Sequence, residues 1–289
     1  METNRRKSKK NGEPIKQPSG SMDKDNSIAS EGSKRVKKSL GKLEQYHLLK
    51  GDPFVQQHLP ETVSYTKENL IRFANQYPVV FIKHDTSGQG RGVYRLAKKS
   101  DHFYSLKGYS LQGNEVDEVM NIDEIHKVLQ PFERFGRTQP YVIQEGINSV
   151  SVRGQHVNIR VHVQHVNGTA LVGGIYGSID YKENGITNIR RGSFAVSMGP
   201  LLFKLLELKK EQQQDVLNKL SELSVAAAQV TARHYPSREC GVDLGLDENL
   251  KPFIFEVNIT PGIGGFTMVD KQMWKRIVEN RKKMKDSVI

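Results

Sequence analysis

One stretch near the C-terminal end of this 289-residue chain constrains the fold most strongly, because it contains a turn signal between two apolar runs. Asp247, Glu248 and Asn249 form a cluster of the kind that favours turns. Residues 241–246 and 252–257 on either side are therefore predicted to be the two arms of a β-hairpin. The chain is expected to contain an antiparallel sheet built on this hairpin.

Three polar side chains of the hairpin are predicted to converge. Side chains alternate between the two faces of a strand. One face of the second arm would carry Ile254, Glu256 and Asn258, and the other would carry Phe255 and Val257. Asp243 on the first arm lies across from the end of the second arm, so two carboxylates and an amide meet at one end of the sheet. Such oxygen ligands suit Mg²⁺ bound together with substrate phosphates, although a hairpin with solvated acidic residues is the simpler alternative.

The order of these residues resembles a known signature. Asp243, followed by Glu256 and Asn258 and then by Pro261-Gly262, resembles the magnesium-binding signature of the ATP-grasp ligases. The resemblance implies that Asp243, Glu256 and Asn258 coordinate one or two Mg²⁺ ions that bridge the phosphates of ATP. It also implies that Gly262 lets the backbone approach a second substrate.

The N-terminal segment differs in composition from the rest of the chain. Residues 1–42 contain twelve Lys or Arg against five Asp or Glu, and they contain no aromatic residue. Such a segment cannot bury enough apolar surface to fold alone, so residues 1–40 are predicted to be a disordered basic tail. The tail either solubilises the chain or binds an acidic partner. Because it lacks aromatic residues for base stacking, no sequence-specific nucleic-acid binding is expected.

The location expected from the sequence is cytoplasmic. The sequence shows neither an apolar secretory signal region nor an apolar run of transmembrane length. The lone Cys240 excludes an intramolecular disulfide and fits a reducing compartment.

A glycine-rich loop lies between two predicted strands, residues 79–83 and 93–96. The loop contributes Ser87, Gly88, Gly90 and Gly92. Exposed backbone N–H groups of such a loop can wrap a polyphosphate, and Lys83 at the strand end, taken to be exposed, adds a cation. The loop opens a strand and not a helix, so it is no Walker A loop. A plain hairpin turn is the alternative.

Residues 140–147 are predicted to be a strand that ends in a polar pair and a glycine. This end resembles the hinge between the two subdomains of an ATP-grasp protein. The hinge residues are Gln144, Glu145, Gly146 and Ile147. By the resemblance, the backbone of residues 145–147 would read the edge of the adenine.

Residues 156–164 alternate strictly between polar and apolar side chains. Asn158, Arg160, His162 and Gln164 share one face, and Val and Ile residues share the other. One face is therefore predicted to be core and the other to line a wet site. Arg160 is the candidate for neutralising a transferred phosphate, because its planar guanidinium suits phosphate oxygens.

Helical signals surround these strands, at residues 43–50, 66–76 and 207–234. In the second of these helices, Ile71 is expected to contribute to packing together with its apolar neighbours. A further amphipathic helix is expected to pack behind the strands through Ile122, Ile125, Val128, Leu129 and Phe132.

From about residue 41 to the end, the order of elements resembles the YheC/YheD-like ATP-grasp proteins, which are associated with the coat of bacterial endospores. The matching segments include Leu59-Pro60-Glu61-Thr62, residues 80–93, Asn158-Ile159-Arg160-Val161, Thr187-Asn188 and Arg191-Gly192. The resemblance implies an α+β fold in which two subdomains clasp ATP between antiparallel sheets. The lead-in would be residues 41–78, the glycine-loop subdomain 79–143 and the metal-binding subdomain 144–289.

The same resemblance implies roles for individual residues. The phosphate contacts would be Lys83, Ser87, Gly88, Gly90 and Gly92. Arg160 and Arg191 would contact a phosphate or acyl phosphate, and Asn188 would line the site. The implied activity is that of an ATP- and Mg²⁺-dependent ligase, which activates a carboxylate as an acyl phosphate for attack by an amine or thiol.

Three positions depart from the family pattern. Asn158 stands where an Asp is usual, Ser178 where a strand arginine is expected, and Ser193 in place of the second glycine of a pair. Losing an arginine weakens the stabilisation of phosphoryl transfer. The domain that usually precedes the ATP-grasp core is also not expected here. Two alternatives therefore stay open: an ATP-grasp phosphotransferase, and a spore-coat interaction protein that keeps the nucleotide pocket without turnover.

Overall fold

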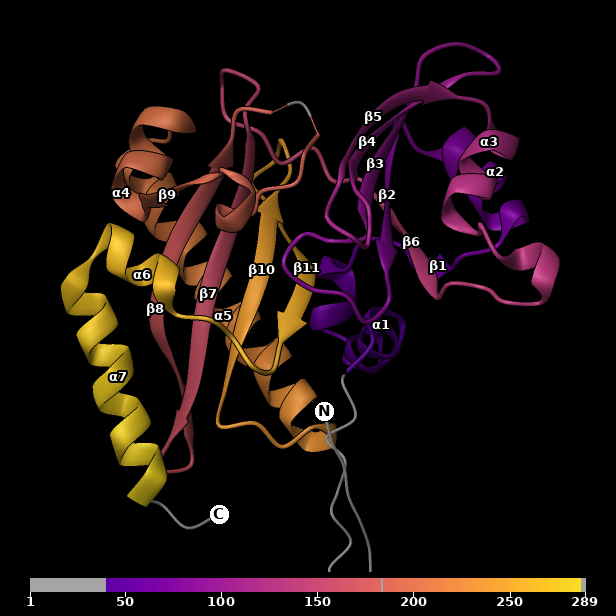
Figure 1. The fold of residues 1–289 in the computed structure, drawn as a ribbon. Coiled ribbons are helices and arrows are strands. Elements are labelled where there is room, and N and C mark those ends of the chain that lie inside the picture. The colour runs from indigo at the N-terminus through magenta and orange to yellow at the C-terminus, as the bar shows by residue number, and fades with distance from the viewer. Residues whose placement is uncertain (1–39, 183, 287–289) are drawn as a thin grey trace, which may run out of the picture. The chain divides into compact units, whose positions relative to one another are not determined.

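The computed structural model describes residues 40–182 and 184–286, so all but the last residue of the predicted basic tail lies outside the described residues. The described chain forms two antiparallel sheets with helices on their faces, which confirms the predicted α+β class (Figure 1). No helix in this part of the chain is both long and apolar enough to cross a membrane.

The first sheet has six strands in the order β1-β6-β2-β3-β4-β5. In chain order they are β1 (Thr62–Ser64), β2 (Val79–His84), β3 (Val93–Lys98), β4 (Tyr104–Tyr109), β5 (Glu115–Met120) and β6 (Tyr141–Glu145). The predicted strand–glycine loop–strand unit is confirmed as β2 and β3, which pair in antiparallel register. Its loop lies at the end of the sheet nearest helix α1 (Lys42–Lys50) (Figure 1).

Helices α2 (Lys67–Gln76) and α3 (Ile122–Leu129) cover one face of this sheet (Figure 1). Each begins at a capping residue, because Thr66 accepts from the Asn69 N–H and Asn121 accepts from the Glu124 N–H. Three side chains expected to pack are instead exposed: Ile71, Val128 and Phe132. Both helices are short, so each turns only a narrow stripe to the sheet. Phe132 is not on the predicted helix at all, because α3 ends at Leu129.

The second sheet has five strands in the order β11-β10-β7-β8-β9. In chain order they are β7 (His156–Val166), β8 (Thr169–Asp180), β9 (Phe194–Ser197), β10 (Glu239–Leu246) and β11 (Pro252–Asn258). Helix α5 (Lys210–His234) covers one face, and α6 (Gly264–Val269) and α7 (Lys271–Asp286) cover the other (Figure 1). Shorter elements are η1 (Val55–His58), η2 (Glu133–Phe135), η3 (Ile189–Arg191), α4 (Met198–Pro200) and η4 (Leu201–Leu205).

Only part of the polar face predicted for β7 lines a pocket. Asn158 and Arg160 line a pocket, but His162 and Gln164 have no exposed surface. Helix α7 covers them, and Gln164 Nε2 donates to the carbonyl of Ile277 at 3.0 Å. Strand alternation showed which side chains share a face, but not that a distant helix covers part of it.

The lead-in helix α1 contacts β1 of the first sheet and both β11 and α5 of the second. The predicted lead-in of residues 41–78 also contributes β1 and α2 to the first sheet and its core. Strand β6 continues to Glu145, beyond the subdomain boundary predicted at residue 144.

Candidate nucleotide site

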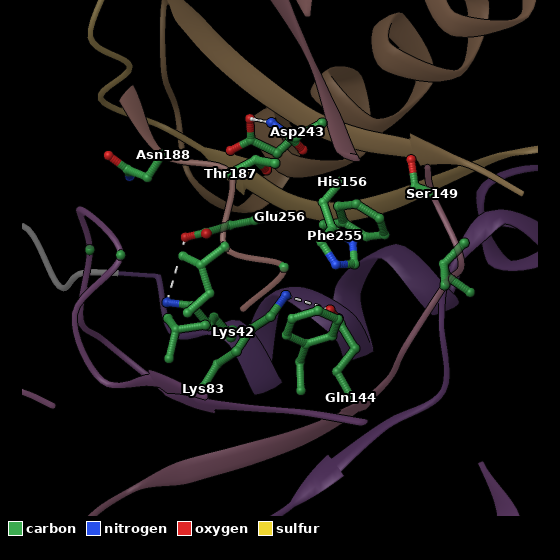
Figure 2. A pocket seen from close by; sticks show the side chains of 18 of the residues that line it. Lys42, Lys83, Gln144, Ser149, His156, Thr187, Asn188, Asp243, Phe255 and Glu256 are labelled. Carbon is green, nitrogen blue, oxygen red and sulfur yellow. Dashed lines mark hydrogen bonds and ion pairs between the residues drawn. The ribbon is translucent and has the colours of Figure 1, made fainter. Parts of the chain in front are cut away.

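A pocket of about 210 Å³ is lined by residues from both sheets (Figure 2). The first sheet contributes side chains of β2, β6 and the glycine loop, and the second contributes side chains of β7, β10 and β11. The predicted site residues that line it are Lys83, Ser87, Gly88, Gly90, Gln144, Glu145, Ile147, Arg160, Asn188, Asp243, Glu256 and Asn258. The fold therefore brings most of the predicted residues together, although they are spread over 176 positions of sequence from Lys83 to Asn258.

Lys83 is enclosed, which corrects the expectation that it is exposed at a strand end. Its Nζ donates to Gln144 Oε1 at 2.5 Å and lies 5.8 Å and 5.7 Å from the ring centres of Phe81 and Phe255. Burial lowers the pKa of Lys83 to about 8, although the Glu256 carboxylate acts in the opposite direction. Lys83 is thus a partly desolvated cation, whose interaction with an anion is stronger than in water.

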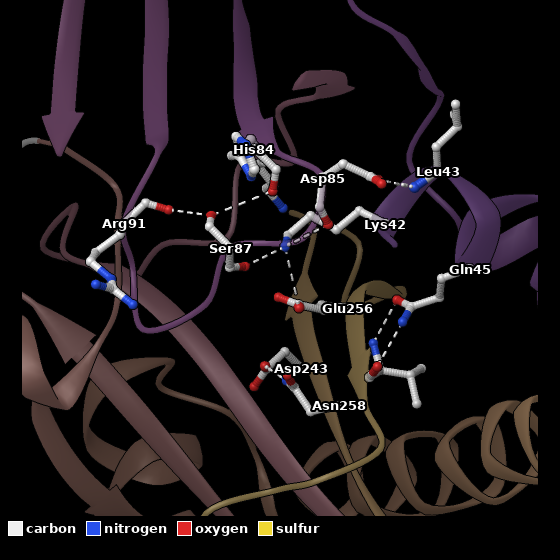
Figure 3. A network of polar contacts seen from close by, with 12 residues as sticks. Lys42, Leu43, Gln45, His84, Asp85, Ser87, Arg91, Asp243, Glu256 and Asn258 are labelled. Carbon is white, nitrogen blue, oxygen red and sulfur yellow. Dashed lines mark hydrogen bonds and ion pairs between the residues drawn. The ribbon is translucent and has the colours of Figure 1, made fainter. Parts of the chain in front are cut away.

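Lys42, the first residue of α1, is a second cation in the pocket, although the sequence shows it only as one of the twelve Lys or Arg of residues 1–42. Its Nζ donates to the Ser87 carbonyl at 2.7 Å and lies 3.6 Å from Glu256 Oε1 (Figure 3). Asp85 holds the start of α1, since its Oδ1 accepts from the Leu43 N–H at 2.9 Å. The sequence feature that could have pointed to Lys42 is its position directly before the predicted helix of residues 43–50.

The glycine loop has a left-handed backbone at three positions, of which Gln89 is the strained one and lines the pocket. Gln89, Gly90 and Gly92 all have positive φ values, of 62°, 68° and 61°. A positive φ is unfavourable for a residue with a side chain such as Gln89, and strain of this kind is concentrated at ligand-binding loops. Gly92 does not line the pocket; its φ is one that residues with a side chain rarely adopt, and a Cβ there would lie 2.9 Å from His84 Cβ, so its role is structural.

The predicted hairpin is confirmed as β10 and β11, but its face assignment is wrong at one point. Asp243 pairs with Glu256 in the register, and a β-bulge follows because Leu244 pairs with Ile254. The bulge inserts Phe255 as an extra residue, which places it in the pocket beside Glu256. Ile254, predicted to share the face of Glu256, instead lies in the core.

Asp243 is surrounded by hydrogen-bond donors. Arg160 binds it in bidentate fashion, with Nε 2.6 Å from Oδ1 and Nη2 2.7 Å from Oδ2. Asn158 Nδ2 and Asn258 Nδ2 also donate to it, at 3.2 Å and 3.0 Å. Asn158, which stands where the family pattern usually has Asp, therefore donates to this carboxylate. An ionised Asp could not make this contact.

The donor set fits Mg²⁺ that shares phosphate oxygens with a nucleotide. Asp243 and Glu256 supply two carboxylates at paired register positions, and Asn258 supplies an amide oxygen. In the described part of the chain no three His, Cys, Asp or Glu side chains converge as a metal-binding group. A metal ion held here would therefore need further oxygen atoms from the phosphates of the bound nucleotide.

The hinge backbone is already fixed at two of the predicted positions. The Glu145 N–H donates to the Glu61 carbonyl at 2.9 Å, and the Gly146 N–H donates to the Val79 carbonyl at 3.0 Å. Gly146 does not line the pocket, and a Cβ there would lie only 2.6 Å from the Val79 oxygen. Adenine recognition by these residues stays a prediction that involves the Glu145 and Ile147 backbone.

A second pocket of about 750 Å³ continues from the first and shares Asn158, Arg160 and Asp243 with it. Its other polar side chains include Tyr176, Ser178, Thr187, Arg190, Thr260 and Thr267. Arg190 lines this pocket, whereas the predicted Arg191 lines neither pocket. Arg191 of the adjacent pair was expected in the site only by resemblance, because nothing in the sequence of a polar loop distinguishes the directions of two neighbouring arginine side chains.

The arrangement of the two sheets around this pocket defines the class of protein. A strand–glycine loop–strand unit in one sheet faces a carboxylate-bearing hairpin in another across a shared pocket, and this is the architecture of an ATP-grasp protein. The model of the YheC/D like ATP-grasp family matches residues 36–283, and the chain belongs to this family.

Among curated proteins, the chain is 26% identical over 223 residues to the endospore coat-associated protein YheD of Bacillus subtilis. The match covers 75% of this chain and 47% of YheD, so the chain spans about half the length of that relative.

Solved structures that are similar include two ligases. The L-amino acid ligase from Bacillus licheniformis is 14% identical with a TM-score of 0.47, and the match covers 80% of this chain and 42% of that one. The VanG D-Ala:D-Ser ligase from Enterococcus faecalis is 15% identical with a TM-score of 0.47, and the match covers 84% of this chain and 61% of that one.

Proposed function

We propose that the protein binds ATP with Mg²⁺ between its two sheets and joins a carboxylate to an amine or thiol through an acyl phosphate. One observation carries this proposal: Lys42 and Lys83 lie in the same pocket as the hairpin carboxylates Asp243 and Glu256. The two lysines match the phosphates of Mg-ATP, and the two carboxylates match its Mg²⁺.

The charges of the pocket support this assignment. Arg160 and Lys42 pair with Asp243 and Glu256, and Lys83 adds a third positive charge. These cations would bind phosphate oxygens, because charge-assisted hydrogen bonds are stronger than neutral ones. Mg²⁺, when bound by Asp243, Glu256 and Asn258, would neutralise phosphate charge.

The second pocket supplies the place for the acceptor substrates. A carboxylate held there would attack the γ-phosphorus, giving ADP and an acyl phosphate, and an amine or thiol would then displace phosphate and lose a proton. Arg160 would lie next to the transferred group, and Arg190 would attract an anionic substrate. The protein supplies charge and positioning, which are the main contributions to phosphoryl transfer.

A protein without turnover is the second candidate. Ser178 lines the acceptor pocket where the family pattern has an arginine, so this pocket lacks one of the expected positive charges. The name of the relative YheD leads us to propose an endospore-coat setting for either candidate. An acidic partner for the basic tail stays a prediction.

The proposal is tested by thermal unfolding with Mg-ATP. At roughly a hundredfold excess of ligand over Kd, a ligand that binds only the folded state adds about 2.7 kcal/mol. For a chain of this size that corresponds to a shift of roughly 5 °C. Glu256→Gln should lose most of the shift, while Glu248→Gln, an exposed change in the turn of the same hairpin, should keep it. An equal shift in Glu256→Gln and the wild type would remove Glu256 from the site.

Turnover is tested separately. Carboxylate and amine pairs are screened for ADP release with hydroxylamine present. A ligase forms a hydroxamate from the trapped acyl phosphate, whereas a phosphotransferase forms a stable phosphate ester. Binding of Mg-ATP with no product in any pairing would favour the protein without turnover.

A further inference from the structure

The segment between β8 and β9 belongs to the second sheet by sequence, yet two of its side chains bind the first sheet. Lys182 Nζ donates to Tyr109 Oη at 3.1 Å, and Arg191 Nη1 donates to the Gly113 carbonyl at 3.1 Å. Tyr109 ends β4, and Gly113 lies in the turn to β5. The segment, residue 183 aside, is therefore fastened near both of its ends to the β4–β5 hairpin.

The ring of Tyr109 contacts both cations of the segment, Arg191 and Lys182. The guanidinium carbon of Arg191 lies 4.4 Å from the centre of its ring, and Lys182 Nζ lies 5.6 Å from it. Glu115 of β5 adds an ion pair to Lys182 at 3.1 Å. Tyr109 is only 4% exposed, so the contact with Arg191 is partly desolvated, the condition under which cation–π contacts are strongest.

The part of the segment between these anchors forms a wall of the nucleotide pocket. It contributes Gly185, Ile186, Thr187 and Asn188 to the lining. It also packs on the glycine loop, since a Cβ on Gly90 would lie 3.4–3.5 Å from Arg191 Cγ, Asn188 Cβ and Ile186 Cγ2. Holding the two ends of the segment therefore holds this wall against the glycine loop.

We propose that Tyr109, Lys182 and Arg191 form a clamp that keeps this wall closed and sets how long a nucleotide stays bound. The inference rests on the proposed ATP site. Neither Tyr109 nor Arg191 lines the pocket, so both are positioning residues that act through Thr187 and Asn188. Arg191 would thus serve nucleotide binding without touching a phosphate.

The clamp is tested by stopped-flow release of a fluorescent ADP analogue and a fluorescent adenosine analogue. In Arg191→Met, which keeps chain length but removes the guanidinium, both analogues should leave about tenfold faster. Lys182→Met should act in the same direction, and because Lys182 is half exposed, the fold should be unchanged. Lys99→Met removes an equal charge from an exposed position just after β3 of the first sheet, where it lines neither of the two pockets, and should release both analogues at the wild-type rate.

Two outcomes would overturn the clamp, and a third would overturn the proposed ATP site. If Arg191→Met speeds release of the ADP analogue alone, Arg191 contacts phosphate and the clamp is overturned. Wild-type release rates in both Arg191→Met and Lys182→Met would also overturn it. If the wild type binds neither analogue, the proposed ATP site itself fails.

Discussion

At the scale of single residues, Lys83 shows what sequence reasoning reached and what it missed. A lysine at the end of a strand before a glycine loop is visible in the sequence, and the structure places it in the pocket. Its enclosure is not visible, because the enclosing Phe255 comes from the other sheet and reaches the pocket only through a β-bulge. The resulting lower pKa gives Lys83 a pH response that an exposed lysine lacks.

That response predicts opposite effects of pH on ATP affinity and on stability. The pKa of Lys83 is about 8 in the folded protein against 10.5 ordinarily, so between these values the unfolded chain binds the extra proton. As pH rises through this window, Lys83 therefore contributes increasing stability to the nucleotide-free protein. Affinity for ATP should fall about tenfold from pH 7 to pH 9, because the protonated fraction falls by that factor.

Lys83→Met provides the control for this prediction. Calorimetric titration with ATP at pH 7 and pH 9 should show weaker but nearly pH-independent binding in the variant. The same pH dependence in the variant and the wild type would assign the effect to another group.

At the scale of elements, local patterns predicted the hairpins and helices well, and long-range contacts decided the rest. The turn of residues 247–249 and the cap Thr66 act within a few positions, so the sequence shows them. The anchoring of α1 depends on Gln45, 212 positions from its partner. Gln45 Nε2 donates to the Val257 carbonyl at 2.6 Å, and the Val257 N–H donates to Gln45 Oε1 at 2.7 Å.

Gln45 thus satisfies the backbone of an edge strand and holds the helix that carries Lys42. Gln45→Leu would leave two buried backbone groups of Val257 without partners, at a cost of about 2 kcal/mol of unfolding free energy. Urea denaturation should show this loss, whereas the exposed Gln57→Leu should stay within about 0.5 kcal/mol of the wild type. An unchanged urea midpoint in Gln45→Leu would mean that its side chain does not support β11.

At the scale of the whole molecule, the two sheets have separate hydrophobic cores, and the proposed site lies between the sheets. The resemblance to the ATP-grasp proteins predicted this arrangement, and the family match confirms the class. Hydrophobic patterning alone predicts the strands of each sheet, but it does not predict how the two sheets face each other. For this reason Lys42 and Arg190, whose positions depend on that arrangement, were missed.

The central claim is that the polyphosphate of a nucleotide lies between these sheets, against Lys83. Calorimetric titration of the wild type and of Lys83→Ala with ATP and with adenosine, at fixed Mg²⁺, tests it most directly. The loss of a charge-assisted contact is worth about 1.5–3 kcal/mol, so ATP should bind Lys83→Ala roughly tenfold or more weakly. Adenosine, which has no phosphate, should bind both proteins equally. Unchanged ATP affinity in a folded Lys83→Ala protein would contradict the account.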